Sequence, residues 1–135
     1  MKKSILVVDD EEGIQFALKE ILEIEGCSVV AAKTGEEALS VLRTCRDFSL
    51  ILLDFRLPDM TGFEFVGKLT NELQAQIPIV LLSATAGLQQ MKLPLGVAGA
   101  VSKPFDIDEL LNTIQRYGRQ NSISVTGDQS YPEVS

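Results

Sequence analysis

Short apolar runs alternate along the chain with longer stretches in which apolar residues recur every three or four positions. Runs of the first kind predict buried strands, and stretches of the second kind predict amphipathic helices. The predicted strands are residues 5–8, 29–32, 48–53, 79–82 and 98–101. Five strands that alternate with helices are typical of an α/β fold, in which helices cover both faces of a parallel sheet.

Residues that favour helix ends stand at the expected borders of three predicted helices. Gly26 follows the first helix and is suited to end it, because glycine readily adopts a left-handed conformation. Thr34 is expected to cap the second helix, with Glu37 three residues later. Asp106 and Glu109 form the same kind of capping pair at the start of the last helix.

Two segments fit the alternation less well. Residues 86–95 predict only a weak helix, because Gly87 starts it and Pro94 cannot lie in a helix interior without breaking it. After Gly118 the composition turns polar, as in a tail or linker. We therefore predict one domain over residues 1–118 and a polar tail or linker over residues 119–135.

The composition narrows the class of protein. A chain of 135 residues with 45% hydrophobic content has enough apolar surface for one core. The net charge of -7 disfavours direct contact with nucleic acid and favours cations or basic surfaces as partners. No apolar run is long enough to cross a bilayer or to form a signal-peptide core. We therefore expect a cytoplasmic protein without membrane contact.

The counts of histidine and cysteine exclude several kinds of site. The chain has no histidine, which rules out a histidine-dependent catalytic triad and a phosphohistidine carrier. Cys27 and Cys45 are not spaced as a metal or redox pair. We expect both to be ordinary packed thiols.

Polar residues follow four of the predicted strands. They are Asp9 and Asp10 after the first strand, Asp54 after the third, Ser83 after the fourth and Lys103 after the fifth. Ligands of open parallel sheets bind outside the carboxyl ends of the strands, so these side chains are expected to share one edge. Acidic residues in the first turn of a helix need no such explanation, because the helix dipole favours them there.

This set of side chains predicts phosphoryl-transfer chemistry. Clustered carboxylates repel one another unless a cation holds them, and an all-oxygen set suits Mg²⁺. Asp54 is a candidate nucleophile, since carboxylates form acyl phosphates. Mg²⁺, the Lys103 ammonium and the Ser83 hydroxyl would contact the phosphoryl oxygens. Taken alone, Ser83 is more often a strand-end cap and Lys103 a solvated lysine, so the interpretation rests on the whole set.

Four segments resemble the receiver domain of bacterial two-component response regulators, namely VVDDEE, LILLDFRLPDMTGFE, PIVLLSATA and VSKPF. The resemblance covers residues 3–117 and implies a flavodoxin-like (βα)5 fold, a doubly wound five-stranded parallel sheet with strand order 2-1-3-4-5. The implied function is that of a phosphoacceptor signalling domain. It switches conformation to control a partner protein or a linked output domain.

The resemblance also implies roles for individual residues. Asp54 receives the phosphoryl group from a histidine kinase. Mg²⁺ is bound directly by Asp10, Asp54 and the backbone carbonyl of Arg56, while Asp9 acts through water. The Lys103-Pro104 bond is expected to be cis, which aims Lys103 inward. Such a domain is not an enzyme for a separate substrate, although it catalyses its own phosphorylation and dephosphorylation.

One position departs from the family pattern. Receiver domains usually carry a tyrosine or phenylalanine three residues before the lysine, and this chain has Ala100. The aromatic arm of the usual switch is therefore missing. Arg56 stands two residues after the nucleophile, where its guanidinium could reach the phosphoryl group or cover it from water.

Two alternatives belong to other classes of protein, and a third is a degenerate receiver. A haloacid-dehalogenase-like phosphatase would need a second aspartate two residues after the nucleophile, where this chain has Arg56. A flavodoxin-type electron carrier would need a phosphate-binding loop after the first strand, where acidic residues stand. A degenerate receiver would keep the fold and act as a phosphorylation-independent binding module, but the intact set of site residues argues against it.

Overall fold

The computed structural model describes residues 3–74, 76–84, 93 and 96–118. Its five strands form a single parallel sheet with the order β2-β1-β3-β4-β5. The strands are β1 (Ser4–Val8), β2 (Ser28–Ala32), β3 (Leu50–Asp54), β4 (Ile79–Ser83) and β5 (Val97–Ser102). The predicted strand order is thus confirmed, and the third strand is shifted so that Asp54 is its last residue.

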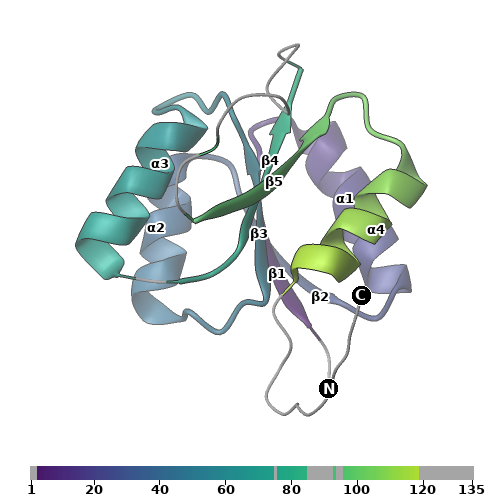
Figure 1. Cartoon of the computed structure of the whole chain (residues 1–135), viewed down its shortest axis with the longest axis horizontal. Coiled ribbons are helices and arrows are strands. Elements are labelled where there is room, and N and C mark those ends of the chain that lie inside the picture. The colour runs from purple at the N-terminus through teal and green to yellow at the C-terminus, as the bar shows by residue number, and fades with distance from the viewer. Residues whose placement is uncertain (1–2, 75, 85–92, 94–95, 119–135) are drawn as a thin grey trace.

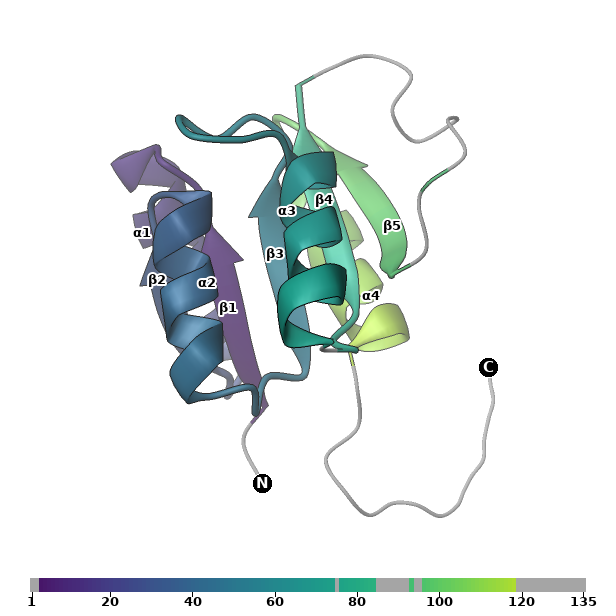
Figure 2. The same cartoon turned by 90° about the vertical axis from the view of Figure 1, so that its left-hand side faces the viewer.

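Helices cover both faces of the sheet (Figure 1). They are α1 (Glu12–Ile24), α2 (Gly35–Thr44), α3 (Gly62–Lys68), which continues directly as the π-helical turn η1 (Leu69–Leu73), and α4 (Ile107–Tyr117). Figure 2 shows α2 and α3 side by side on one face, and α1 and α4 lie on the other. The predicted weak helix falls almost wholly outside the described residues, and so does the tail.

Two apolar layers separate the sheet from these helices. Alternate strand residues such as Leu6 and Leu53 pack toward α2 and α3, whereas neighbours such as Val7 and Leu52 pack toward α1 and α4. All five residues of β3 are buried. The central strand therefore needs apolar side chains at successive positions, which explains its unbroken hydrophobic run.

The helix caps confirm part of the predicted pattern. The Thr34 hydroxyl accepts a hydrogen bond from the Glu37 amide at 3.0 Å, and the Asp106 carboxylate accepts bonds from the amides of Asp108 and Glu109. The Glu37 carboxylate accepts from the amide of Lys33 and not from that of Thr34, so this cap is offset by one residue. The expectation of two packed thiols is half wrong, because Cys27 is buried but Cys45 is exposed.

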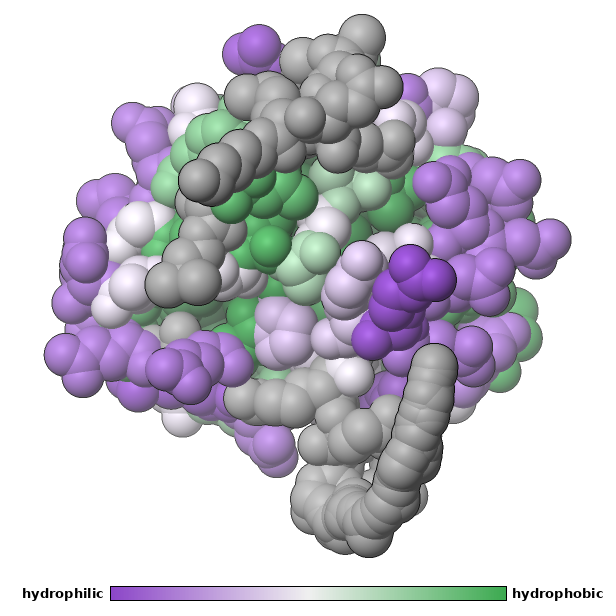
Figure 3. All heavy atoms as spheres, in the orientation of Figure 1, coloured by the Kyte–Doolittle hydropathy of each residue, from purple (hydrophilic) through white to green (hydrophobic). Residues whose placement is uncertain are grey.

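The face of the molecule seen in Figure 3 is mostly hydrophilic where helices form it. In Figure 3, hydrophilic side chains gather over α3 and α4, and hydrophobic ones lie between them around β5. Within the part of the chain that the structure describes, no helix is both long and apolar enough to cross a bilayer.

Candidate phosphorylation site

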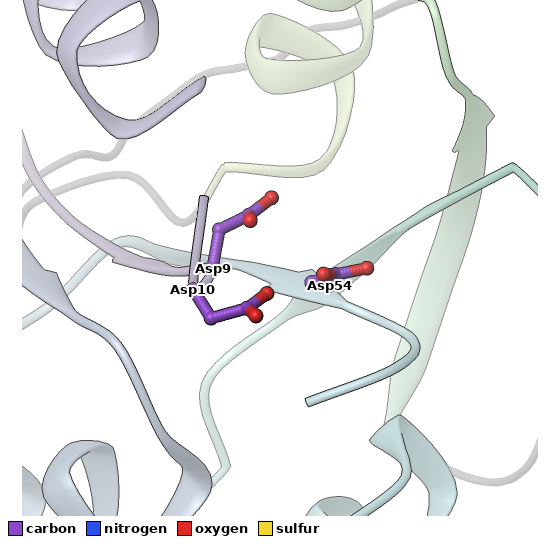
Figure 4. A group of neighbouring side chains, drawn as sticks. All are labelled: Asp9, Asp10 and Asp54. Atoms are coloured by element: carbon purple, nitrogen blue, oxygen red, sulfur yellow. The ribbon is translucent and has the colours of Figure 1, made fainter. Parts of the chain in front are cut away.

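Three carboxylates meet at the carboxyl edge of the sheet. Figure 4 shows Asp9 and Asp10 on the segment after β1 and Asp54 at the end of β3, with the carboxylate of Asp10 directed toward Asp54. Each of the three residues offers an oxygen, and these oxygens lie within 4.8 Å of one another. The parallel pairing of β1 with β3 places them there, because Val8 is the register partner of Leu53.

Lys103 reaches this group from the end of β5. Its Nζ lies 2.8 Å from Oδ2 of Asp9, 3.5 Å from Oδ1 of Asp54 and 3.4 Å from Oε1 of Glu11. Its backbone amide donates to the carbonyl of Ser83 at 2.8 Å, and the Lys103-Pro104 bond is cis. The cis bond and the inward direction of the side chain, which the family resemblance implied, are thus both found.

Asp9 is completely buried and held on both sides of its carboxylate. Oδ2 accepts from the Lys103 ammonium, and Oδ1 accepts from the amide of Glu11 at 2.9 Å. The backbone carbonyl of Asp9 accepts from Nε2 of Gln15, which also donates to the carbonyl of Ala32. Asp9 therefore has a fixed position, and both of its carboxylate oxygens already have a donor.

Burial and charge act on the other two central groups in different ways. Burial raises the pKa of Asp54 and the nearby Asp9 carboxylate raises it further, against the opposing effects of Lys103 and of the Arg56 amide. Burial alone would lower the pKa of Lys103, but its hydrogen bond to Asp9 and the charges around it raise the pKa above its usual value. The site thus keeps its lysine charged and disfavours the negative charge on Asp54. A bound cation would reduce the electrostatic repulsion among the carboxylates.

A pocket of about 310 Å³ opens beside these groups. It is lined by Asp10, Glu11, Asp54, Arg56, Ser83, Ala84 and Lys103. The pocket thus includes all of the predicted site residues except Asp9, which is fully buried and bonded to Lys103. Carboxylate oxygens are hard ligands, and three of them at the ends of β1 and β3 form a donor set that fits Mg²⁺.

Comparison with known proteins decides the family. The sequence model of the response regulator receiver domain matches residues 5–115. The chain belongs to this family. Because this match spans most of the chain, it assigns the described strands and helices to the receiver family and not to the haloacid-dehalogenase-like or flavodoxin-type families.

The receiver domain is similar to curated bacterial regulators. It is 33% identical to sporulation initiation phosphotransferase F of Bacillus subtilis, over 87% of this chain and 94% of the relative. It is 38% identical to the uncharacterized transcriptional regulatory protein YkoG of the same species, over 89% of this chain. The chain spans only 53% of YkoG, so it matches about half the length of that relative.

Solved structures agree with this placement. The chemotaxis response regulator CheY4 of Vibrio cholerae is 33% identical with a TM-score of 0.78, and the match covers 87% of this chain and 99% of that one. Response regulator protein TrrA of Thermotoga maritima, solved in complex with Mg(2+)-BeF, is 33% identical with a TM-score of 0.75. That match covers 85% of this chain and 98% of TrrA.

Three contacts around the site of the receiver domain were missed by sequence reasoning. They involve Glu11, which reaches Lys103, Gln15, which holds the loop after β1, and Asp59, which accepts two amides from α2. Glu11 and Asp59 join segments that meet only when the sheet has formed, and Gln15 does so through its second bond, to the carbonyl of Ala32, so no local pattern signals these contacts. The capping box of Thr61 and Glu64 was also missed, although its T-x-x-E spacing is readable in the sequence.

Ala100, at the position where the family usually has an aromatic residue, lies beside a groove of the receiver domain. Ala100 lines an open groove of about 710 Å³ between β5 and α4. Tyr117 of α4 lies on the other side of this groove and approaches Gly99 so closely that a Cβ there would be 3.1 Å from its ring. Among the described residues that line the groove, the aromatic side chain is Tyr117, which comes from α4 and not from β5.

Proposed function

We propose that this receiver domain accepts a phosphoryl group on Asp54 from the phosphorylated histidine of a kinase. The observation that carries the proposal is the position of the Asp54 carboxylate, which lines a pocket between an acidic pair and the Lys103 ammonium. A carboxylate oxygen of Asp54 would attack the phosphorus while the kinase nitrogen leaves. The resulting acyl phosphate would lie beside Lys103, whose charge compensates the added negative charge.

Mg²⁺ would be held directly by Asp10, Asp54 and the backbone carbonyl of Arg56. Asp9 would act through water, because both of its carboxylate oxygens already accept hydrogen bonds. When bound, the metal supplies positive charge for the phosphoryl oxygens. The Mg(2+)-BeF complex of the relative TrrA supports this choice of ion.

The remaining residues of the pocket would bind and cover the phosphoryl group. The buried Ser83 hydroxyl lines the pocket and can donate to a phosphoryl oxygen. Lys103 is held by its bond to Asp9, and its ammonium also lies close to Asp54. From there it can donate to a phosphoryl group carried by Asp54. Arg56 is exposed at the pocket mouth, where its guanidinium can shield the acyl phosphate from water.

The phosphorylated domain would control a partner protein or a linked output domain. Relatives that carry the names of transcriptional regulators are about twice as long as the match, which is the length that a linked output domain would need. We place the protein in the cytoplasm, with no direct nucleic acid or membrane contact from this domain. Its catalysis would be confined to its own phosphorylation and dephosphorylation.

The experiment is to incubate the protein with acetyl phosphate, with and without Mg²⁺, and to record its intact mass. The proposal predicts one added phosphoryl group that depends on Mg²⁺ and is absent from a folded Asp54→Asn variant. An unmodified wild-type protein would instead favour the degenerate receiver, a binding module that acts without phosphorylation.

A further inference from the structure

The loop between β3 and α3 carries Arg56, whose backbone carbonyl is one of the proposed Mg²⁺ ligands. The loop is closed by its own hydrogen bonds, from the amide of Leu57 to the carbonyl of Met60 at 3.0 Å and from the amide of Gly62 to the carbonyl of Phe55. An isolated antiparallel β-bridge pairs the backbones of Arg56 and Thr61. These bonds define the shape of the loop, but they do not connect it to the half of the site that follows β1.

Asp59 makes that connection through α2. Its Oδ1 accepts from the amide of Gly35 and its Oδ2 accepts from the amide of Glu36, each at 2.9 Å. The first amides of a helix have no partner within the helix, and the helix dipole favours a negative charge beside them. These two bonds lower the pKa of Asp59 although burial alone would raise it.

A second contact joins the same two segments. A Cβ built on Gly35 would lie 2.5 Å from Sδ and 2.7 Å from Cγ of Met60. Any side chain at position 35 would therefore displace Met60 from the start of α2. The packing of Met60 against Gly35 and the hydrogen bond between Gly35 and Asp59 therefore join the same two segments. Together they form one junction between the loop after β3 and the start of α2.

The junction links the two halves of the acidic site. α2 packs against β1 and β2, and β1 leads directly into Asp9 and Asp10. The loop held by Asp59 leads back through Arg56 to Asp54. Asp59 is not among the residues that line the pocket, so its hydrogen bonds act on the proposed metal ligands through the backbone of the loop.

We propose that Asp59 is a positioning residue, which clamps the loop after β3 to the start of α2 and so holds the Arg56 carbonyl in place for Mg²⁺. The inference rests on the proposed function for the identity of the ion. The clamp itself concerns only residues of this chain, so it can be tested without metal.

The first arm of the test is amide hydrogen exchange on the metal-free protein. Asp59→Ala should accelerate exchange at Leu57 and Gly62 by about tenfold or more, since hydrogen bonds to a charged acceptor are lost. Thr34→Ala is the matched control, because it removes a side-chain cap from the same end of α2 without touching the loop. Unchanged exchange in Asp59→Ala, or equal acceleration in Thr34→Ala, would overturn the clamp.

The second arm measures Mg²⁺ affinity from amide shifts of residues 54–62. Asp59→Ala should weaken binding by about tenfold, as for other residues that orient metal ligands from outside the coordination sphere. Asp59→Asn keeps one acceptor and should give a smaller loss, while Gly35→Ala should reproduce the loss with Asp59 intact. Thr34→Ala should leave the affinity unchanged.

The outcomes separate the two proposals. If Asp59→Ala and Gly35→Ala bind Mg²⁺ as tightly as the wild type, the positioning role is wrong. If the wild type itself shows no shift with Mg²⁺, the proposed function fails at its metal site, and the exchange experiment alone then judges the clamp. Should Asp59→Ala fail to fold, both the hydrogen-exchange and the Mg²⁺-affinity measurements are made on Asp59→Asn and Gly35→Ala.

Discussion

Lys103 and Asp9 are 94 residues apart in the sequence, yet the ammonium of one lies 2.8 Å from the carboxylate of the other. Asp9 is fully buried, and only 12% of the Lys103 side chain is exposed. The pair joins the end of β5 to the segment after β1, across the ends of the two strands that lie between them. It therefore fixes the lysine at a place from which it also reaches Asp54.

Lys103→Met should lower the free energy of unfolding by about 3 kcal/mol, because it leaves a buried carboxylate without its partner. Adding Asp9→Asn should recover part of that loss, since the buried charge is then removed as well. Urea denaturation measures both variants. The control is Lys33→Met, which breaks an exposed ion pair with Glu12 and should cause no measurable loss.

The pH dependence of this difference has a definite sign. A raised pKa means that the stabilisation from Lys103 is complete below the usual lysine value of 10.5 and is lost only as the pH rises beyond it. The gap between wild type and Lys103→Met should therefore stay constant from neutral to mildly alkaline pH. A gap that closes in that range would show that the lysine is not charged as described.

Asp10→Ala should abolish the amide shifts that Mg²⁺ causes around residues 10 and 54. Asp10 is exposed at the pocket and is directed toward Asp54, so few other ligands can replace it. Asp47→Ala removes one exposed carboxylate elsewhere and controls for the change in net charge. Equal saturation in wild type and Asp10→Ala would place the ion at another site.

Arg56→Ala should shorten the lifetime of the acyl phosphate and leave its rate of formation nearly unchanged. The side chain is exposed at the pocket mouth, with its guanidinium carbon 5.8 Å from the centre of the Phe55 ring. Its loss removes a cover and a cation from beside the phosphoryl oxygens. The decay of phosphorylated protein after removal of acetyl phosphate measures the effect, and an unchanged decay rate would show that the side chain plays no part.

Ser83→Ala should suppress the conformational response to a phosphate mimic. Because Ala100 supplies no aromatic arm, a contact to Ser83 can be passed on only through the backbone, with a coupling free energy of about 1 to 3 kcal/mol. Beryllofluoride with Mg²⁺ should shift amide resonances mainly in residues 84–99, and Ser83→Ala should reduce these shifts while Asp54 remains phosphorylatable. Ser102→Ala, which removes a hydroxyl from the strand residue paired with Ser83, is the control. Large shifts confined to α4 would exclude this route.

The positions of the site residues were predictable because each of them stands at the end of a strand or directly after it. Asp9, Asp54 and Ser83 are brought to one edge by any parallel arrangement of strands, so a correct reading of the strands is sufficient to group them. The order of the strands is a different matter, since it came from the family resemblance and not from periodicity. Local caps such as Thr34 with Glu37 were also readable, because both partners lie within one turn.

The contacts that fix the geometry were not predictable in the same way. Gln15 bonds to the carbonyls of Asp9 and Ala32, and Asp59 bonds to the start of α2, only because helices and loops lie at particular distances above the sheet. Their residue types are common on protein surfaces, so the sequence offers no reason to select them. The exposure of Cys45 was missed for a related reason, because the end of α2 had to be located before the cysteine could be placed.

The most direct test of the account is to find the residue that carries the phosphoryl group. Protein treated with acetyl phosphate and Mg²⁺ is reduced with borohydride, which converts an aspartyl phosphate to homoserine, and is then digested for peptide mass spectrometry. The account predicts homoserine at position 54 and nowhere else, and none in a folded Asp54→Asn variant. Homoserine at position 9 or 10, or continued modification of Asp54→Asn, would contradict it.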